Sequence, residues 1–212
     1  MAYSDFTLDR ITKIFGINIE ERTNVFTAFD QLAVDAFFIK YLQNNIPLAQ
    51  AISTEKAKSE MIIAPVLIEV RRLLDNKISL FSGIDFNVNI EQGLNGFCDF
   101  LIGLSSQQLY VTSPVIALVE AKNDNLKQGF AQCIAEMIAA AQLNQSEGNN
   151  VENIYGCVTN GNQWVFLKLT GNLVIVDLDE YYINQPEKII SVFVSLIKSE
   201  LESNPKYISR IS

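Results

Sequence analysis

The sequence predicts an α/β fold in which helices flank a mixed β-sheet, preceded by an N-terminal helical extension. Apolar residues repeat at helical spacing in the first third of the chain, strand-like segments follow one another from residue 78, and one helix-like segment interrupts them. We expect the extension over residues 1–52 and the sheet-containing domain over residues 53–212. A chain of 212 residues is long enough for one such domain with an extension.

Residues 5–50 have a helical pattern, clearest over residues 30–42, where apolar residues are spaced three and four apart. This helix should end near Pro47, because proline removes a backbone hydrogen bond. A second helix is predicted over residues 54–75, with an apolar stripe made of Ile63, Val66, Leu67, Val70, Leu73 and Leu74. Pro65 lies within this segment, so the helix should bend there or begin near residue 64, with Glu60 in the preceding turn.

Strands are predicted over residues 78–88, 96–104 and 114–121, and again over residues 154–159, 164–169 and 173–178. A helix over residues 126–143 separates the two groups, and Pro186 opens a last helix over residues 187–203. Residues 96–104 alternate, which places Asp99 on the face opposite Cys98. Residues 114–121 are an almost continuous apolar run, typical of a strand buried on both faces.

The composition excludes several kinds of site. The chain has no histidine, which removes Ser-His-Asp and Cys-His catalysis. Its three cysteines are far apart, with no CxxC pair, which argues against a zinc site and against disulfides. No apolar run is long enough to span a membrane and the first residues do not resemble a signal peptide, so we expect a cytoplasmic protein without a membrane partner. The net charge of −8 argues against a protein that coats DNA.

One constellation of residues points to chemistry. Asp99 lies on one predicted strand, while Glu120 and Lys122 lie at the end of the next, where alternation places both on one face. If the strands pair, Asp99 approaches Glu120, and two carboxylates in an apolar sheet need a positive charge to neutralise them. Mg²⁺ prefers oxygen ligands and would do so. Lys122 would then orient or help deprotonate a water, or stabilise charge on a phosphate. The simpler interpretation is a strand-end ion pair between Glu120 and Lys122.

This pattern resembles the PD-(D/E)XK nuclease superfamily. Asp99 matches the aspartate of the motif and Glu120-Ala121-Lys122 matches its (D/E)XK, while Cys98 stands in place of the proline. In particular, residues 55–180 resemble the nuclease domain at the N-terminus of type I restriction motor subunits, and residues 159–164 are similar to the TNG-x-x-W turn of those domains. The resemblance implies a restriction endonuclease-like fold. We expect Trp164 of this turn to pack in the core rather than stack on a base.

The resemblance also implies two site residues from helices. The first is an acid before the strands, for which Glu60 is the best match and Glu69 is its rival, and the second is a glutamine after Lys122, for which Gln132 fits. The expected metal ligands are Glu60, Asp99 and Glu120, and the expected catalytic residues are Asp99, Glu120, Lys122 and Gln132.

The function that the resemblance implies is hydrolysis of DNA phosphodiester bonds with Mg²⁺, for which Mn²⁺ should substitute. A homodimer and a partner protein that supplies DNA affinity are both compatible with this function. The alternative is a catalytically silent module that keeps the nuclease fold and acts with a partner protein. The acidic net charge favours this alternative, whereas the complete set of Asp99, Glu120 and Lys122 disfavours it.

Overall fold

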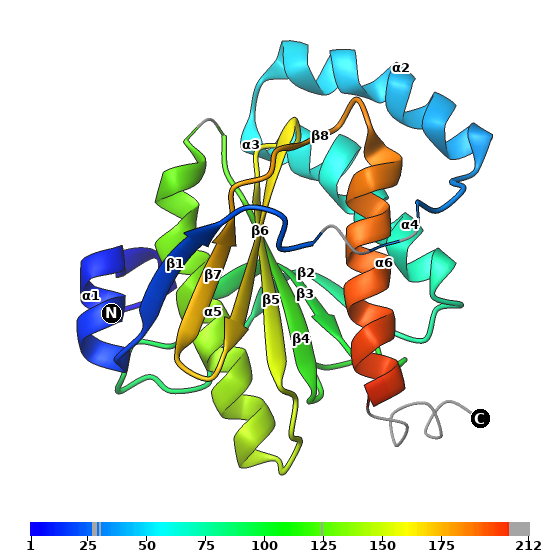
Figure 1. Ribbon diagram of the computed structural model, residues 1–212. Coiled ribbons are helices and arrows are strands. Elements are labelled where there is room, and N and C mark those ends of the chain that lie inside the picture. Colours follow the sequence, from blue (N-terminus) through cyan, green and yellow to red (C-terminus); the bar gives the residue numbers. More distant parts are fainter. Residues whose placement is uncertain (27–28, 30, 124, 204–212) are drawn as a thin grey trace.

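The computed structural model describes residues 1–26, 29, 31–123 and 125–203. Within these residues the chain forms an eight-stranded mixed sheet with helices on both faces, so the predicted α/β class is confirmed (Figure 1). The main path of the sheet has the order β1-β7-β6-β5-β4-β3-β2, and β8 pairs with β6. The pairs β4–β5 and β1–β7 are parallel, whereas the other pairs are antiparallel.

The predicted strands and the two later helices are present within a few residues of their expected bounds. The first group of strands is β2 (Ser79–Asp85), β3 (Phe97–Gly103) and β4 (Val115–Ala121), followed by helix α5 (Leu126–Ser146). The second group is β5 (Asn153–Thr159), β6 (Gln163–Thr170), β7 (Leu173–Asp177) and β8 (Tyr181–Tyr182), followed by helix α6 (Pro186–Ser203).

The N-terminal segment differs from the expected helical extension. It contains a 3-10 turn (η1, Tyr3–Asp5) and helix α1 (Leu8–Phe15), and then strand β1 (Asn18–Arg22), which adds to the sheet beside β7. The helical prediction is therefore wrong at β1. This edge strand is exposed along most of its length, so its side chains give no apolar alternation, and backbone bonds to β7 define it. The domain boundary at residue 52 stays a prediction.

Helix α2 (Ala36–Ile52) continues through Pro47, so the predicted end near this proline is wrong. The predicted start at residue 30 lies outside the described residues, and the helix begins after Asp35, whose carboxylate accepts a hydrogen bond from the Phe37 amide at 2.6 Å. The carbonyl of Gln43 loses its helical partner to Pro47, but both residues are exposed, so water can bind that oxygen.

Of the two alternatives for Pro65, the structure has the start of an α-helix at residue 64, with Glu60 in the turn before it. Helix α3 (Glu55–Lys58) passes into a π-helical turn (η2, Ser59–Ile63), and helix α4 (Ala64–Leu73) follows, with Pro65 in its first turn. The Ala64 amide donates to the Ser59 carbonyl, five residues back. Pro65 has no amide hydrogen to continue this pattern, and the π-turn ends just before it.

The sheet separates two apolar layers. Helices α4, α6 and α2 lie on one side, and α5 and α1 lie on the other (Figure 1). Trp164 is fully buried in the first layer, where its ring packs edge-on against Phe193 at 6.2 Å, as expected for a core residue. None of the described helices has both the length and the apolar composition that a bilayer span requires.

A buried amide fixes α5 against the sheet. Asn144, near the end of α5, accepts hydrogen bonds from the Val115 amide at 2.8 Å and the Ser113 hydroxyl at 3.0 Å, and it donates to the Val115 carbonyl at 2.7 Å. One side chain thus satisfies three polar groups at the start of β4. Since α5 lies directly on β4 and β5, this contact sets the position of the helix along β4.

We predict that Asn144→Leu destabilises the fold by about 3 kcal/mol or more, because the buried amide and carbonyl of Val115 lose this partner and the Ser113 hydroxyl is left with its bond from Asn149. Urea unfolding followed by the fluorescence of the single tryptophan, Trp164, measures the change. The exposed neighbour Gln145→Ala is the matched control and should change stability by less than about 0.5 kcal/mol. Equal stability of the two variants would contradict the assignment.

Candidate functional site

The site lies where β3 begins and β4 ends, beside the first half of α5. The antiparallel register pairs Phe100 with Val119, so Asp99 and Glu120, one step further, meet at the same level. One oxygen of Asp99 accepts a hydrogen bond from the Ala121 amide at 2.8 Å. The negative charge of Asp99 acts directly on Glu120 and raises its pKa. The two carboxyl groups therefore share one place at the end of adjacent strands.

Lys122 brings a positive charge to these carboxyl groups. Its ammonium forms an ion pair with Glu120 and donates a second hydrogen bond to Oε1 of Gln132 on α5, at 3.2 Å. Its backbone amide donates to the Thr159 carbonyl at 2.8 Å, which continues the pairing of β4 with β5 by one residue. Four residues predicted for the site thus lie together: Asp99, Glu120, Lys122 and Gln132.

Glu136 joins this group and was not predicted. It lies one helical turn after Gln132, is completely buried, and accepts a hydrogen bond from Nε2 of Gln132 at 3.1 Å. The second oxygens of Glu136 and of Glu120 are both buried, with no hydrogen-bond partner among the described residues. The available signal was the spacing of Gln128, Gln132 and Glu136, which places the three side chains on one face of the helix.

Burial dominates the electrostatics of the three acids. The pKa of Glu120 is raised to about 8, first by burial and then by the charge of Asp99, and the Lys122 ammonium offsets only part of this rise. Burial raises the pKa of Glu136 well above its ordinary value, and the charge of Glu120 adds to this. The pKa of Asp99 is also raised by burial, although its bond from the Ala121 amide and the charge of Lys122 act in the opposite direction.

Lys122 is held in its charged form. Burial lowers the pKa of its amine, but the charge of Glu120 and the hydrogen bond to it outweigh that effect, so the pKa lies above its ordinary value. An ammonium with a raised pKa cannot take a proton from water at neutral pH. Of the roles expected for Lys122, this geometry favours stabilisation of negative charge and disfavours deprotonation of a water.

Cys98 differs from its predicted orientation. It packs in the same apolar cluster as Leu101 on the α5 side of the sheet, so strict alternation along β3 is not kept. Burial, and then the neighbouring charge of Glu136, raise the pKa of its thiol. Gly83 of β2 lies across from this part of β3 with a φ of 60°, a left-handed conformation that bends the strand, so the regular pleat on which alternation depends is interrupted.

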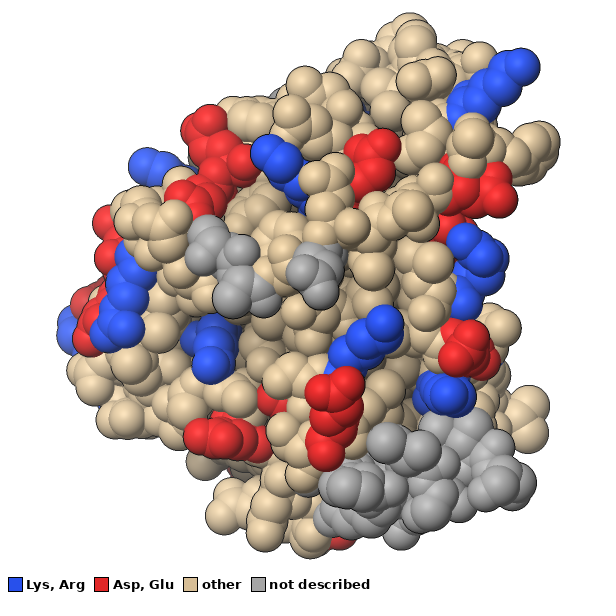
Figure 2. Space-filling view, turned by 45° about the vertical axis from the view of Figure 1, so that its right-hand side comes forward, with Lys and Arg blue, Asp and Glu red and all other residues tan. Residues whose placement is uncertain are grey.

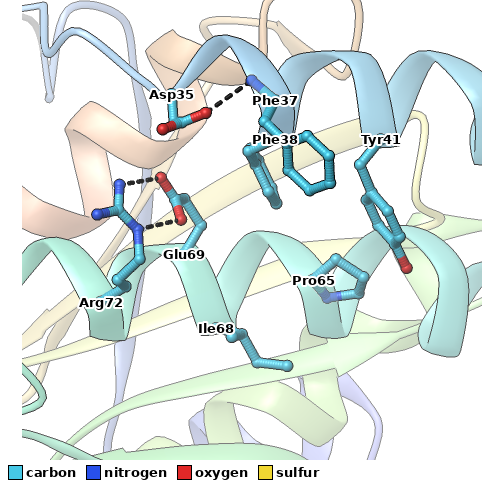
Figure 3. Close-up of a pocket in the computed structure, with 8 residues that line it drawn as sticks. All are labelled: Asp35, Phe37, Phe38, Tyr41, Pro65, Ile68, Glu69 and Arg72. Carbon is cyan, nitrogen blue, oxygen red and sulfur yellow. Dashed lines mark hydrogen bonds and ion pairs between the residues drawn. The ribbon is translucent and has the colours of Figure 1, made fainter.

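The structure does not join either candidate for the helical acid, Glu60 or Glu69, to the other predicted site residues. Glu60 has a side chain that is 61% exposed and pairs with Lys56 at 3.5 Å, and no hydrogen bond or ion pair joins it to the described site residues. Both oxygens of Glu69 accept from Arg72 at 2.7 Å, in a groove between α2 and α4 (Figure 3). The charge of the exposed Glu55, the first residue of α3, also raises the pKa of Lys122, but less than burial lowers it and less than Glu120 and Asp99 raise it.

The turn after β5 connects α3 to the site. The Thr159 hydroxyl accepts from the Gly161 amide at 3.0 Å and donates to the Gln163 carbonyl at 2.8 Å, which closes the turn. A side chain at Gly161 would begin 3.3 Å from Cβ of Lys58, so α3 packs closely on the turn. The Lys58 ammonium then donates to the Asn123 carbonyl at 2.8 Å, directly after Lys122. The α3 segment thus fixes the chain that follows β4.

The chemistry of these residues fits Mg²⁺ or Mn²⁺. Among the described residues, no three His, Cys, Asp or Glu side chains form a ready ligand set. Mg²⁺, however, is usually held by one or two carboxylates together with waters and substrate phosphates. Asp99, Glu120 and the Ala121 carbonyl offer oxygen donors, and the unpartnered buried oxygen of Glu120 is the observation that favours a cation here. No family model, curated protein or solved structure matches this chain.

We predict that Glu120→Gln flattens the pH dependence of stability in metal-free buffer. Because the folded pKa of about 8 lies above the ordinary 4.5, the folded state keeps a proton that the unfolded state releases. Glu120 therefore makes wild type less stable as pH rises from about 4.5 to about 8, by on the order of a few kcal/mol in total. Urea unfolding at pH 5 to 8.5 with a chelator measures this slope.

The exposed Glu147→Gln, at the end of α5, is the control and should keep the wild-type slope. Identical slopes for Glu120→Gln and wild type would show that Glu120 is not buried as described.

Proposed function

We propose that the chain is a metal-dependent nuclease that hydrolyses DNA phosphodiester bonds, with a fold and site of the restriction endonuclease-like, PD-(D/E)XK kind. The observation that carries this proposal is the meeting of Asp99, Glu120 and Lys122 at the ends of two adjacent strands. A chance strand-end ion pair would be exposed, but the Glu120 side chain is only 1% exposed, and a second acid faces it.

In this proposal each residue has a separate task. Asp99 and Glu120, with the Ala121 carbonyl, hold Mg²⁺, which supplies an activated water and stabilises charge on the phosphate. Lys122 places its ammonium beside the same point, where it neutralises the oxygen that becomes negative as the phosphate is attacked. Gln132 accepts a hydrogen bond from that ammonium at 3.2 Å and keeps it in place. Glu55 adds a further negative charge on the α3 side of Lys122.

DNA affinity needs a further source in this proposal. The net charge is −8, and on the face in Figure 2 the Lys and Arg side chains are scattered among Asp and Glu without a continuous basic area. Binding to the phosphate backbone depends on such areas. A second copy of the chain or a partner protein would supply the missing contacts, and a bound cation would reduce the repulsion at the site itself.

The groove between α2 and α4 favours the second candidate function, a silent module that acts with a partner protein. Phe37 is 81% exposed and Ile68 is 59% exposed on opposite sides of this groove, where Tyr41 lies on α2 with Phe37 and Pro65 lies on α4 with Ile68 (Figure 3). Exposed apolar residues gathered in a groove are typical of surfaces that bind other proteins. This surface is separate from the Asp99–Glu120 site, so the two functions are also compatible.

We predict that Lys122→Ala lowers the rate of plasmid or single-stranded DNA cleavage with Mg²⁺ or Mn²⁺ by about 10²- to 10³-fold, as expected for loss of one preorganised charge. Gel-based cleavage assays measure the rate. Lys40→Ala, on the exposed surface of α2, is the control and should stay near the wild-type rate. Wild type that does not cleave, or equal cleavage by Lys122→Ala, rules out the proposed nuclease.

We predict that Mn²⁺ or Mg²⁺ raises the melting temperature of wild type at pH 8.5 and that Asp99→Asn loses this rise. A ligand at about one hundred times its dissociation constant stabilises by about 2.7 kcal/mol. Asp9→Asn, an exposed acid of α1, should keep the wild-type shift. The silent module predicts no metal-dependent shift in any of these proteins, so the titration separates the two functions.

A further inference from the structure

Lys122 is held from behind by a short chain of hydrogen bonds on α5. Its ammonium donates to Oε1 of Gln132 at 3.2 Å, and Nε2 of Gln132 donates to Oε1 of Glu136 at 3.1 Å. Exposure falls along this chain, from a Lys122 side chain that is 22% exposed to a Glu136 that is completely buried. Two paths lead from Glu136 to the ammonium, one through the neighbouring Glu120 and one through Gln132, and the Gln132 path is the one with the hydrogen bonds described above.

The side-chain amide of Gln132 has two different ends, and its orientation decides what Lys122 meets. The oxygen end can only accept, while the nitrogen end can only donate. Glu136 offers an acceptor on the inner side, so it binds the nitrogen end and turns the oxygen end toward the ammonium. Without an acceptor at position 136, the amide can rotate by half a turn and present its N–H groups to Lys122, which would be repulsive.

Either protonation state of Glu136 serves this purpose, because a carboxyl group keeps an acceptor oxygen in both. Glu136 also interacts with Glu120 and with the Cys98 thiol, and the bond from Gln132 is its contact on the side of the Lys122 ammonium. A buried acid is costly to keep, and core packing alone would be better served by leucine at this position.

The stem of Lys122 is positioned by the same helix. Gly129 lies one turn before Gln132, and a Cβ at this position would come within 3.1 Å of Cγ of Lys122 and 2.6 Å of Cγ1 of Val158. The aliphatic stem of Lys122 therefore passes directly along the backbone of α5 at Gly129, and a residue with a side chain there would block its path. Helix α5 thus sets the path of the stem through Gly129 and the direction of the ammonium through Gln132.

We propose that Glu136 is a positioning residue that fixes the amide orientation of Gln132, and so holds the Lys122 ammonium beside Glu120. The geometric part of this inference does not depend on catalysis. Its consequence for the reaction rests on the proposed nuclease function, because a displaced ammonium would lose its place at the phosphate while substrate binding elsewhere is unchanged.

The test that is independent of activity is competitive acetylation of the folded protein, with Lys122 labelling quantified by mass spectrometry against the exposed Lys127. Glu136→Leu removes the acceptor and should raise the relative labelling rate of Lys122 about tenfold, the worth of one hydrogen bond to a charged group. Glu136→Gln keeps an acceptor oxygen and should stay within about twofold of wild type. Ile134→Val, a buried change on α5 outside the chain of bonds, is the control for mild core damage and should also stay at the wild-type rate.

Cleavage kinetics form the second arm. If wild type cleaves DNA, Glu136→Leu should lower kcat about tenfold with KM nearly unchanged, and Glu136→Gln should restore kcat. Equal Lys122 labelling in Glu136→Leu and wild type, or an equal rise in Ile134→Val, overturns the positioning role. Absence of cleavage by wild type overturns the proposed nuclease instead, and the labelling result still decides the role of Glu136.

Discussion

The structure depends on one costly arrangement, in which the carboxyl groups of Glu120 and Glu136 are buried beside a single ammonium. Each is at most 1% exposed, and each has one oxygen without a partner among the described residues. Replacing such a group by a well-packed apolar side chain is often neutral or stabilising, so stability alone does not account for its presence. Strongly perturbed acids gather at functional sites because chemistry needs them there. This cost is the main physical reason to regard the end of β4 as a site.

The surrounding fold fixes this arrangement through the unit formed by β4, α5 and β5, where contacts hold the helix to the strand at two places. At one end of β4, Asn144 binds the backbone of Val115, and at the other end Lys122 binds the Thr159 carbonyl and Gln132. Helix α5 is therefore fixed to the strand at two points, one near each end. A carboxylate on β4 and another on α5 consequently face each other at a defined height, as a site that must hold reacting groups requires.

Local patterns were sufficient for the strands from β2 to β7 and for placing Asp99, Glu120 and Lys122 at the ends of two of them. They were insufficient for Glu136, because an acid on the polar side of a helix is usually exposed, whereas this one is completely buried. Strand β1 has exposed side chains and is defined by backbone pairing alone, which no side-chain pattern records. Glu55 and Glu60 lie on one continuous helical segment, and the local pattern does not show that the charge of Glu55, rather than that of Glu60, acts on Lys122.

Under the proposed function, Glu120 has two competing partners, the Lys122 ammonium and a divalent cation. A carboxylate that binds a cation offers less negative charge to a lysine, so Lys122 needs another acceptor to stay at the same point. Gln132 is a neutral acceptor that does not compete for the cation, and its own orientation is set by Glu136, which lies deeper in the protein. This division of tasks explains why a glutamine and a buried glutamate occur together behind Lys122. Asp99 and Glu120 carry the negative charge, and Gln132 and Glu136 keep the Lys122 ammonium beside them.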